Sequence, residues 1–450
     1  MNYFNLKLHN TTVRKEIISG IITFIAMSYI LAVNPKMLGE VGMDERGVFV
    51  ATIVTIIITT LVGALYTKMP LAYAPSISLN TIAIPIVIEM CDGEWSMVML
   101  ATYLSGVMLL LLLYLGIYDR VVTIIPSYVK YSIMAGIGLA IALMGAQYLQ
   151  VVSISKYGIS VHSLLKKEVL FSIIAIIMVH IMYLKKKRGA VAVGLLVTYI
   201  LVAISELITY YQTHGHSFHH WLDTYMSHGI TMKNFTNVAY QFPTAESYLF
   251  DYTKLIQLIM IVFTFTMIHF FDSYGTVAAL LERIKEEDKN FNKDAQKKCM
   301  LVNAIGAIVS GCAGTTSVTS YAENVAGIEN GAKTGLSAIV VCIGFALSVF
   351  FAPVFAVMSE YMVAPIMIYV GMIFLYNLKK LREEKLCERI SAIVIFLYAG
   401  ITFQLGIAVC LGLLLNIVLR VITGRHKEIT KKGILVVLSC LISLLIMLYC

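Results

Sequence analysis

Charged residues are scarce in this chain of 450 residues: Asp, Glu, Lys and Arg make up 13% of it, against about 25% in an average soluble protein. Hydrophobic residues make up 59%, and the mean hydropathy is +0.83. A soluble protein of this length has too little interior to hide so much apolar side chain from water. The composition therefore excludes a disordered chain and indicates a polytopic helical membrane protein.

Three further features are missing from the sequence. The eight cysteines are scattered and form no C-x-x-C pair, so they are predicted to be small apolar residues of helices in a reducing or lipid setting. No Walker A loop is present, so nothing supports ATP-driven work by this chain. The polar stretch 1–16 leads into an apolar run long enough to span, so we expect no cleaved signal peptide.

The net charge of +8 could indicate a polyanion, but the positive residues lie in short loops between apolar runs, so we expect lipid and no nucleic acid. Runs long enough to span lie on either side of a polar gap. They are 17–34, 48–67, 71–90, 95–117, 127–148, 168–184 and 191–209, and then 255–281, 299–311, 315–328, 335–358, 362–378, 388–403 and 405–422. A further run at 433–449 leaves thirteen to fifteen spans open. Fourteen spans with a cytoplasmic N-terminus place 27 of the 34 Lys and Arg residues inside, in agreement with the positive-inside rule.

The third run of each half is unlike a lipid-facing helix. Residues 70–82 contain two prolines, two serines and an asparagine, and residues 311–327 are rich in glycine and hydroxyl groups before a glutamate. Each is predicted to form a short extended strand and then a half-helix, which begins near Ser76 or near Tyr321. Non-helical backbone survives at membrane depth only inside protein or beside a cavity. Such breaks at matching positions of two halves indicate a transporter's binding site.

Two carboxylates fall deep within the spans, away from their ends. Asp272 lies ten residues before the next charged residue, or about 15 Å along a helix, which places it near the midplane. Glu323 follows the glycine-rich break, where the N–H groups of a starting helix favour an anion. Both are predicted to function in transport because an unpaired buried charge is costly; helix-end roles are the alternatives. His269, on the same helix face as Asp272, is either a proton relay or a histidine satisfied within the protein.

Two other features leave alternatives open. Asn34 and Pro35 end the first span, where they either line a cavity or simply stop the helix. The four histidines of 214–220 have metal-like spacing, but no cysteine or carboxylate completes a ligand set, so a solvated loop is preferred. We therefore expect no metal and no cofactor.

Five segments carry a recognisable family pattern: 11–35, 42–52, 135–143, 316–327 and 333–341. The fourth reads Thr-Ser-Val-Thr-Ser-Tyr-Ala-Glu-Asn-Val-Ala-Gly. In this order, and over nearly the whole chain, they resemble the AzgA-type purine permeases of the nucleobase–ascorbate (nucleobase:cation symporter 2) superfamily.

The resemblance implies an all-α membrane fold of about 14 spans, a seven-plus-seven inverted repeat with short extended strands and half-helices in spans 3 and 10. It divides the chain into a core domain of 1–117 and 254–360, a gate domain of 118–209 and 361–450, and an extracellular loop at 210–253.

By the same resemblance, the nucleobase lies between the strands and half-helices of spans 3 and 10. Asp272 and Glu323 hold it, and Asn34 belongs to the same site. Independently of the resemblance, the aromatic side chains of Tyr73, Phe271 and Tyr321 are candidates to stack on its ring face.

The chain also departs from the family pattern. Span 3 of the family usually reads Ala-Pro-Gly-Met-Gly-Leu-Asn, whereas 74–80 here place Ser76 and Ser78 at the two glycine positions, so their hydroxyls join the candidate site. The family usually has an Asp where His269 stands. These departures bear on purine choice and proton stoichiometry, and Asp272, Glu323 and His269 are the candidates to carry the proton.

We expect a plasma-membrane importer of a purine base (adenine, guanine or hypoxanthine) that is driven by the proton gradient. A carboxylate suits this substrate because its N–H groups are donors and a charged acceptor forms the stronger bonds. The alternatives are an uncoupled facilitator or channel, and a symporter for xanthine, urate or a pyrimidine. A membrane-embedded enzyme is a third alternative, but no nucleophile–base pair or metal cluster in the sequence supports it. A homodimer is compatible with the sequence.

Overall fold

The computed structural model describes residues 2–118, 120, 126–155, 158–161, 167–184, 197, 200, 201, 204, 232–243, 252–287, 295–352, 360–402 and 405–425. Within these segments, five helices are long and apolar enough to cross a membrane: Val13–Gly39, Glu45–Thr67, Trp95–Tyr114, Ser127–Tyr148 and Tyr252–Glu286. The predicted run at 433–449 and the histidines of 214–220 lie outside the described residues, as does nearly all of the run at 191–209.

The remaining predicted runs coincide with helices or with strand and helix pairs. The first half contains α1 (Val13–Met27), α2 (Ile30–Gly39), α3 (Glu45–Thr67), β1 (Tyr73–Pro75), α4 (Ile77–Glu89), α5 (Trp95–Tyr114), α7 (Ser127–Tyr148), β2 (Val152–Ser155), β3 (Gly158–Val161) and α8 (Lys167–Leu184). The second half contains α11 (Met232–Thr236), α13 (Tyr252–Glu287), α14 (Ala295–Ala313), β4 (Val318–Ser320), α15 (Asn324–Glu329), α16 (Gly335–Ser348), α18 (Glu360–Leu375), α19 (Leu386–Thr402) and α20 (Leu405–Ile422). Short 3-10 helices lie at Asn2–Phe4 (η1), Val349–Phe351 (η2) and Tyr376–Glu383 (η3).

Local sequence explains both helix breaks. Residues that precede a proline favour extended backbone, and β1 ends in Ala74-Pro75. In the second half, Gly314 adopts a positive φ of 87° just after α14, which ends that helix. The strand β4 then begins with two β-branched residues, Val318 and Thr319. The predicted short strands and half-helices are therefore present in both segments.

The two strands pair with each other across the fold. β1 and β4 are antiparallel, with Tyr73 opposite Ser320 and Pro75 opposite Val318, and all of their residues are buried. At one end of the pair, the amide of Ser76 donates to the carbonyl of Ser317 at 2.9 Å. The two broken segments, far apart in the sequence, thus satisfy each other's backbone groups inside the protein.

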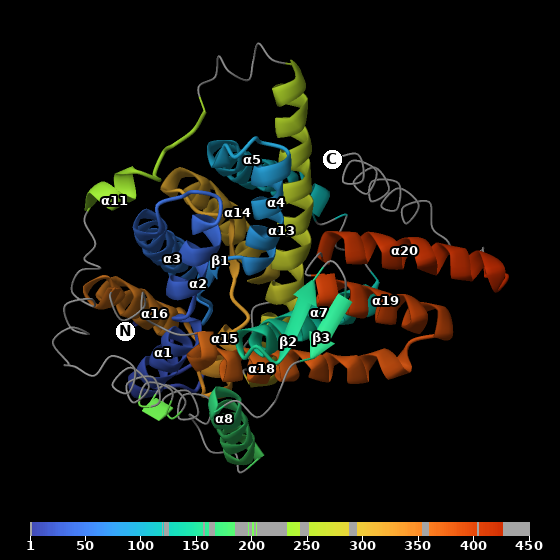
Figure 1. The fold of residues 1–450 in the computed structure, drawn as a ribbon. Coiled ribbons are helices and arrows are strands. Elements are labelled where there is room, and N and C mark those ends of the chain that lie inside the picture. The colour runs from blue at the N-terminus through green and yellow to red at the C-terminus, as the bar shows by residue number, and fades with distance from the viewer. Residues whose placement is uncertain are drawn as a thin grey trace.

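The helices pack into two groups. One contains α1 to α5 together with α14, α15 and α16, and the other contains α7, α18, α19 and α20. The long helix α13 contacts α5 and α14 in the first group and α7 and α20 in the second, and Figure 1 shows it standing between them. The β1–β4 pair belongs to the first group.

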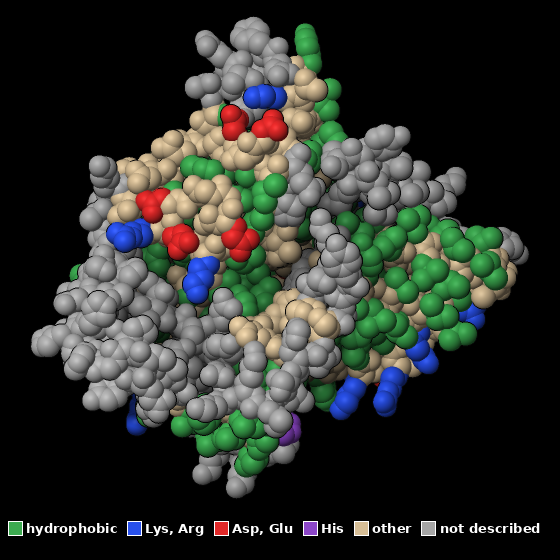
Figure 2. Space-filling model, viewed as in Figure 1, with side chains coloured by type: hydrophobic (Ala, Val, Ile, Leu, Met, Phe, Trp, Pro, Cys, Tyr) green, Lys and Arg blue, Asp and Glu red, His purple; other side chains and the backbone are tan. Residues whose placement is uncertain are grey.

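The exterior suits a lipid environment. Large apolar side chains on α19 and α20 are exposed, among them Leu386, Ile393, Leu397, Val421 and Ile422. Figure 2 shows hydrophobic side chains covering this region, with Lys and Arg gathered along its lower edge.

Close contact between α7 and α18 depends on glycine. A Cβ added to Gly371 would overlap the carbonyl oxygen of Gly138, and one added to Gly138 would lie 2.7 Å from the carbonyl oxygen of Gly371. Neither helix can retreat without opening the packing of the second group, so a side chain at either position forces the helices apart.

We predict that Gly371→Leu lowers the temperature at which the detergent-solubilised protein unfolds, since overpacking typically costs about 1–3 kcal/mol. The neighbouring Met372 is 40% exposed, so Met372→Leu places the same side chain on the outer face as a matched control. Equal unfolding temperatures for the two variants would contradict the close packing of α7 and α18.

Candidate functional site

A cavity lies between the two helix groups, beside the paired strands. The volume of this cavity is about 70 Å³. Its polar lining comes from the start of α2, from α4, from α13 and from β4 with the turn that follows it. The lining residues are Tyr29, Ser76, Ile77, Ser78, Ile137, Ala140, Ile141, Met144, Asp272, Thr276, Thr319, Ser320, Tyr321, Ala322, Glu323, Met367 and Ala399. The polar side thus belongs to one helix group together with α13, and α7, α18 and α19 supply the apolar side.

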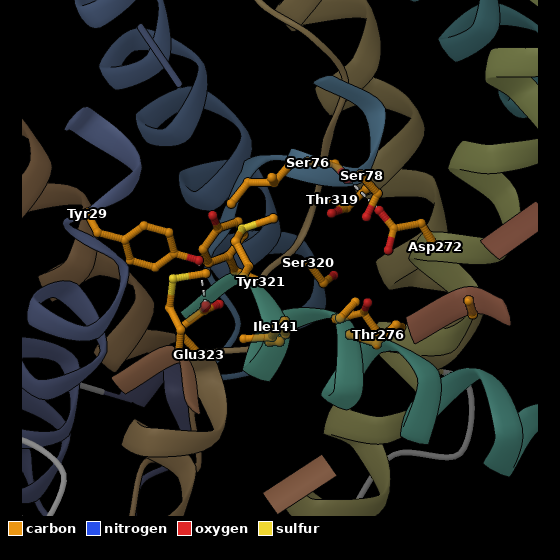
Figure 3. A pocket seen from close by; sticks show the side chains of 17 residues that line it. Tyr29, Ser76, Ser78, Ile141, Asp272, Thr276, Thr319, Ser320, Tyr321 and Glu323 are labelled. Atoms are coloured by element: carbon orange, nitrogen blue, oxygen red, sulfur yellow. Dashed lines mark hydrogen bonds between the residues drawn. The ribbon is translucent and has the colours of Figure 1, made fainter. Parts of the chain in front are cut away.

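Two buried carboxylates face the cavity from different elements. Asp272 on α13 accepts a hydrogen bond from the Ser76 hydroxyl, with 2.6 Å between the oxygens. Glu323, at the start of α15, accepts one from the Tyr29 hydroxyl at 2.7 Å. Figure 3 shows the two carboxylates on opposite sides of the cavity, with Ser320 and Tyr321 between them. No Lys or Arg is among the described residues that line it.

The position of each carboxylate follows from the local backbone. Glu323 precedes the first residue of α15, where it caps the half-helix without a side-chain hydrogen bond to the helix backbone. Ser76 is the extended residue that precedes α4, so its hydroxyl projects beside the strand pair toward α13. Both hydroxyl partners, Ser76 and Tyr29, are buried.

Behind the cavity lies a buried network of amides and hydroxyls. The Asn34 amide nitrogen donates to Thr52 at 2.7 Å and to Thr315 at 2.9 Å, and the Asn34 oxygen accepts from Asn80 at 2.7 Å. Thr316 in turn donates to Asn80. These bonds tie α2, α3 and α4 to the segment that leads into β4, so Asn34 holds the cavity wall and is not part of its lining.

Two other candidates lie near the site without lining it. The His269 ring nitrogens lie 3.2 Å from the Val318 carbonyl oxygen and 3.2 Å from the Ser317 hydroxyl, so the ring braces the backbone at β4. Phe271 packs edge-on against Phe270, with 5.3 Å between ring centroids, in the apolar core. The structure therefore gathers Asp272, Glu323, Ser76, Ser78 and Tyr321 at one cavity, while Asn34, His269 and Phe271 surround it.

Sequence reasoning missed several lining residues. Tyr29 lies within the family-like segment 11–35, but nothing in the sequence linked it to Glu323. Thr276 follows Asp272 by one helical turn, so the helix period alone could have identified it. The apolar lining from α7, including Ile137 and Ile141, falls within the family-like segment 135–143.

The site is compatible with small organic solutes more readily than with a metal. Within the described segments, no group of three or more His, Cys, Asp or Glu side chains is placed to hold a metal ion. Polar groups on one side and apolar side chains on the other are typical of a small-molecule site.

A cavity at the crossing of two broken spans, between two packed helix groups, defines a membrane transporter. The model of the Permease family matches residues 14–409, and the chain belongs to this family, the nucleobase/ascorbate transporters.

Relatives match nearly the whole chain. Adenine permease AdeQ of Escherichia coli is 29% identical over 95% of this chain and 91% of its own length. Adenine permease AdeP of the same organism is 27% identical over 97% and 93%. Guanine/hypoxanthine permease PbuO of Bacillus subtilis is 26% identical over 95% and 96%. The resemblance to purine permeases noted in the sequence is confirmed.

A solved structure with a similar fold is the transmembrane domain of the cyanobacterial bicarbonate transporter BicA. Its TM-score is 0.54 at 15% identity, covering 89% of this chain and 97% of that chain. This similarity concerns the fold alone.

We predict that Asn34→Ala destabilises the protein because it leaves Asn80 and Thr315 without their partner, at about 1–3 kcal/mol for each unsatisfied group. The control is Asn416→Ala, since Asn416 is buried in α20 and its amide nitrogen makes no hydrogen bond to the described residues. Thermal unfolding in detergent measures both variants. An unchanged unfolding temperature together with weakened substrate binding would instead make Asn34 a direct ligand.

Proposed function

We propose that this chain imports a purine nucleobase together with protons across the plasma membrane. The observation that carries the proposal is the pair of buried carboxylates on opposite walls of a cavity that no described cation lines. The names of the relatives, adenine permease and guanine/hypoxanthine permease, support a purine as the substrate.

The cavity offers a chemical match to such a base. Asp272 and Glu323 accept hydrogen bonds from its N–H groups, and such bonds to a charged acceptor are the stronger kind. Ser78, in the first turn of α4, and the free amides of that turn serve the ring's acceptor atoms. Tyr321 contacts a face of the ring. Asn34 and Phe271 act from behind the lining, by holding the elements that form the cavity.

Proton coupling follows from the cost of the buried charges. A carboxylate without a cationic partner at membrane depth is expensive, and either a proton or a substrate N–H donor relieves the cost. Because the cavity has two such groups, a proton on one of Asp272 and Glu323 relieves that charge while the other stays ionised and accepts the substrate's N–H donors, so substrate and proton load together. His269, held between Ser317 and Val318, contributes by keeping β4 in place or by relaying the proton.

Movement of the two helix groups against each other would expose the cavity to each side in turn. We assign the groups to a core domain of 1–117 and 254–360 and a gate domain of 118–209 and 361–450, in a seven-plus-seven inverted repeat of fourteen spans with a cytoplasmic N-terminus. The packing of α7 with α18, α19 and α20, apart from α1 to α5, supports this division. The distribution of Lys and Arg supports the orientation.

We predict that Glu323→Gln weakens uptake of labelled hypoxanthine. The amide keeps the size of the side chain but loses a charge-assisted bond worth about 1.5–3 kcal/mol, or roughly 10–150-fold in affinity. The exposed Glu40 supplies the control Glu40→Gln, which should transport normally. Unlabelled adenine and guanine should compete in the wild type. Near-normal affinity in Glu323→Gln membranes would remove Glu323 from the site.

We predict that Asp272→Asn abolishes accumulation against a gradient while exchange of labelled base persists, because the amide cannot carry the coupled proton. Concentrative uptake and counterflow are measured in vesicles at about pH 5.5 and about pH 7.5. Accumulation by the variant with the wild-type pH dependence would place the proton elsewhere. Wild-type uptake that is insensitive to an uncoupler would favour a facilitator over a symporter.

A further inference from the structure

A second cavity extends the boundary between the two helix groups beyond the first. Its volume is about 30 Å³. On α7, Met134 of its lining lies three residues before Ile137 of the first cavity, and on α13, Ala279 lies three residues after Thr276. Three residues make about one turn of a helix and lie on the same face. The second cavity therefore begins one turn away from the first, along the same two helices.

This second cavity leads from the interior to the surface. Among the residues that line it, Met134 is 1% exposed and Phe374 is 3% exposed, whereas Tyr376 is 55% exposed. The surface end lies at the end of α13 and at η3, beside two strongly basic segments. Residues 283–298 contain six Lys and Arg residues, and 379–389 contain five. By the positive-inside rule, this is the face that we assign to the cytoplasm.

An ion pair joins the two helix groups at the surface end of this cavity. Glu282 of α13 pairs with Lys380 of η3, and η3 packs against α7, α18 and α19. Lys380 is also held on that side by the Tyr131 ring of α7, whose centroid lies 5.3 Å from the Lys380 Nζ. The next residue of α13, Arg283, pairs with Glu329 of α15 at 3.7 Å, within the first group. Adjacent residues of α13 thus form one pair across the boundary and one on a single side of it.

From this arrangement, and resting on the proposed function, we infer that the purine leaves the protein through the second cavity, and that the Glu282–Lys380 pair closes this route. The buried side chains of Met134 and Phe374 stand on the route, so the purine passes only when α7 and α18 move away from α13. That movement breaks the Glu282–Lys380 pair and leaves the pair of Arg283 intact, because α13 and α15 belong to the same domain. The two side chains of the Glu282–Lys380 pair are 25% and 33% exposed, and a pair of this kind is weak enough to break and re-form in every transport cycle.

The first test joins the two groups at this pair. Glu282→Cys with Lys380→Cys is treated in vesicles with a bifunctional thiol reagent, and uptake and counterflow of labelled hypoxanthine are compared with those after a monofunctional reagent. We expect cross-linking to lower both by about 10-fold or more, because the groups can no longer separate. In the matched control, Arg283→Cys with Glu329→Cys, cross-linking should lower transport no further than the monofunctional reagent does. The wild type, with its eight native cysteines, is treated in the same way.

The second test measures how often the route opens. Met134→Cys places a buried thiol on the route, and a membrane-permeant maleimide labels this thiol only while the route is open. In this background, Glu282→Gln should raise the labelling rate by about 2–5-fold, the change expected from the loss of a partly exposed ion pair. Arg283→Gln is the matched control and should leave the labelling rate unchanged, because it breaks a pair within the first group.

The outcomes separate the inference from the function on which it rests. Transport that survives cross-linking of Glu282→Cys to Lys380→Cys, with the linked peptides confirmed by mass spectrometry, overturns the inference. Equal labelling rates in Glu282→Gln and Arg283→Gln overturn it as well. If the double-cysteine variant does not reach the membrane, the labelling rates decide. Absence of hypoxanthine uptake by the wild type would overturn the proposed function and the inference with it, whereas normal wild-type uptake with either of these results overturns the inference alone.

Discussion

The pairing of β1 with β4 is the constraint on which the rest of the structure depends. Non-helical backbone at membrane depth must find partners within the protein, and here each broken segment supplies them for the other. Asn324 completes the arrangement, because its side chain accepts from the Ala72 amide and donates to the Ala72 carbonyl, both at 2.8 Å. Two half-helices can therefore begin in the interior, and the polar groups at their starts become available to a cavity.

The polar residues around the β1–β4 pair form two layers, one facing the cavity and one behind it. Side chains that face the cavity, such as Asp272 and Glu323, each accept a hydrogen bond from one hydroxyl group of the lining. Those behind it, such as Asn34 and Asn80, use their hydrogen-bonding groups on each other and on neighbouring threonines. This division explains how residues that hold the cavity wall and residues that can bind a ligand lie within a few positions of each other in the sequence.

Much of this architecture could be predicted from local patterns. Apolar length identified helices of the described segments, and the proline and glycine breaks identified the short strands, because both signals reside in neighbouring residues. The contacts of Tyr29 with Glu323 and of Asn34 with Thr315 could not be predicted this way. The two residues of the first pair are 294 positions apart in the sequence, and those of the second pair are 281 apart. Only the packing of helices decides which buried side chains meet. For the same reason, the sequence left open whether Asn34 lines a cavity or, with Pro35, stops the first span. The helix stop is wrong, because α2 continues through Pro35 to Gly39.

The strand crossing also has a consequence for how the chain is made. Ribosomes add about 5–20 residues per second, so some tens of seconds pass between the synthesis of Tyr73 and that of its partner Ser320. During that interval the first half lies in the bilayer with one strand edge unmatched. Helices α3 and α5 are complete by then, and α3 carries Thr60, whose hydroxyl accepts from the Tyr73 amide at 3.0 Å in the folded protein. During synthesis, β1 therefore remains unpaired beside the early helices until β4 in the second half of the protein has been made.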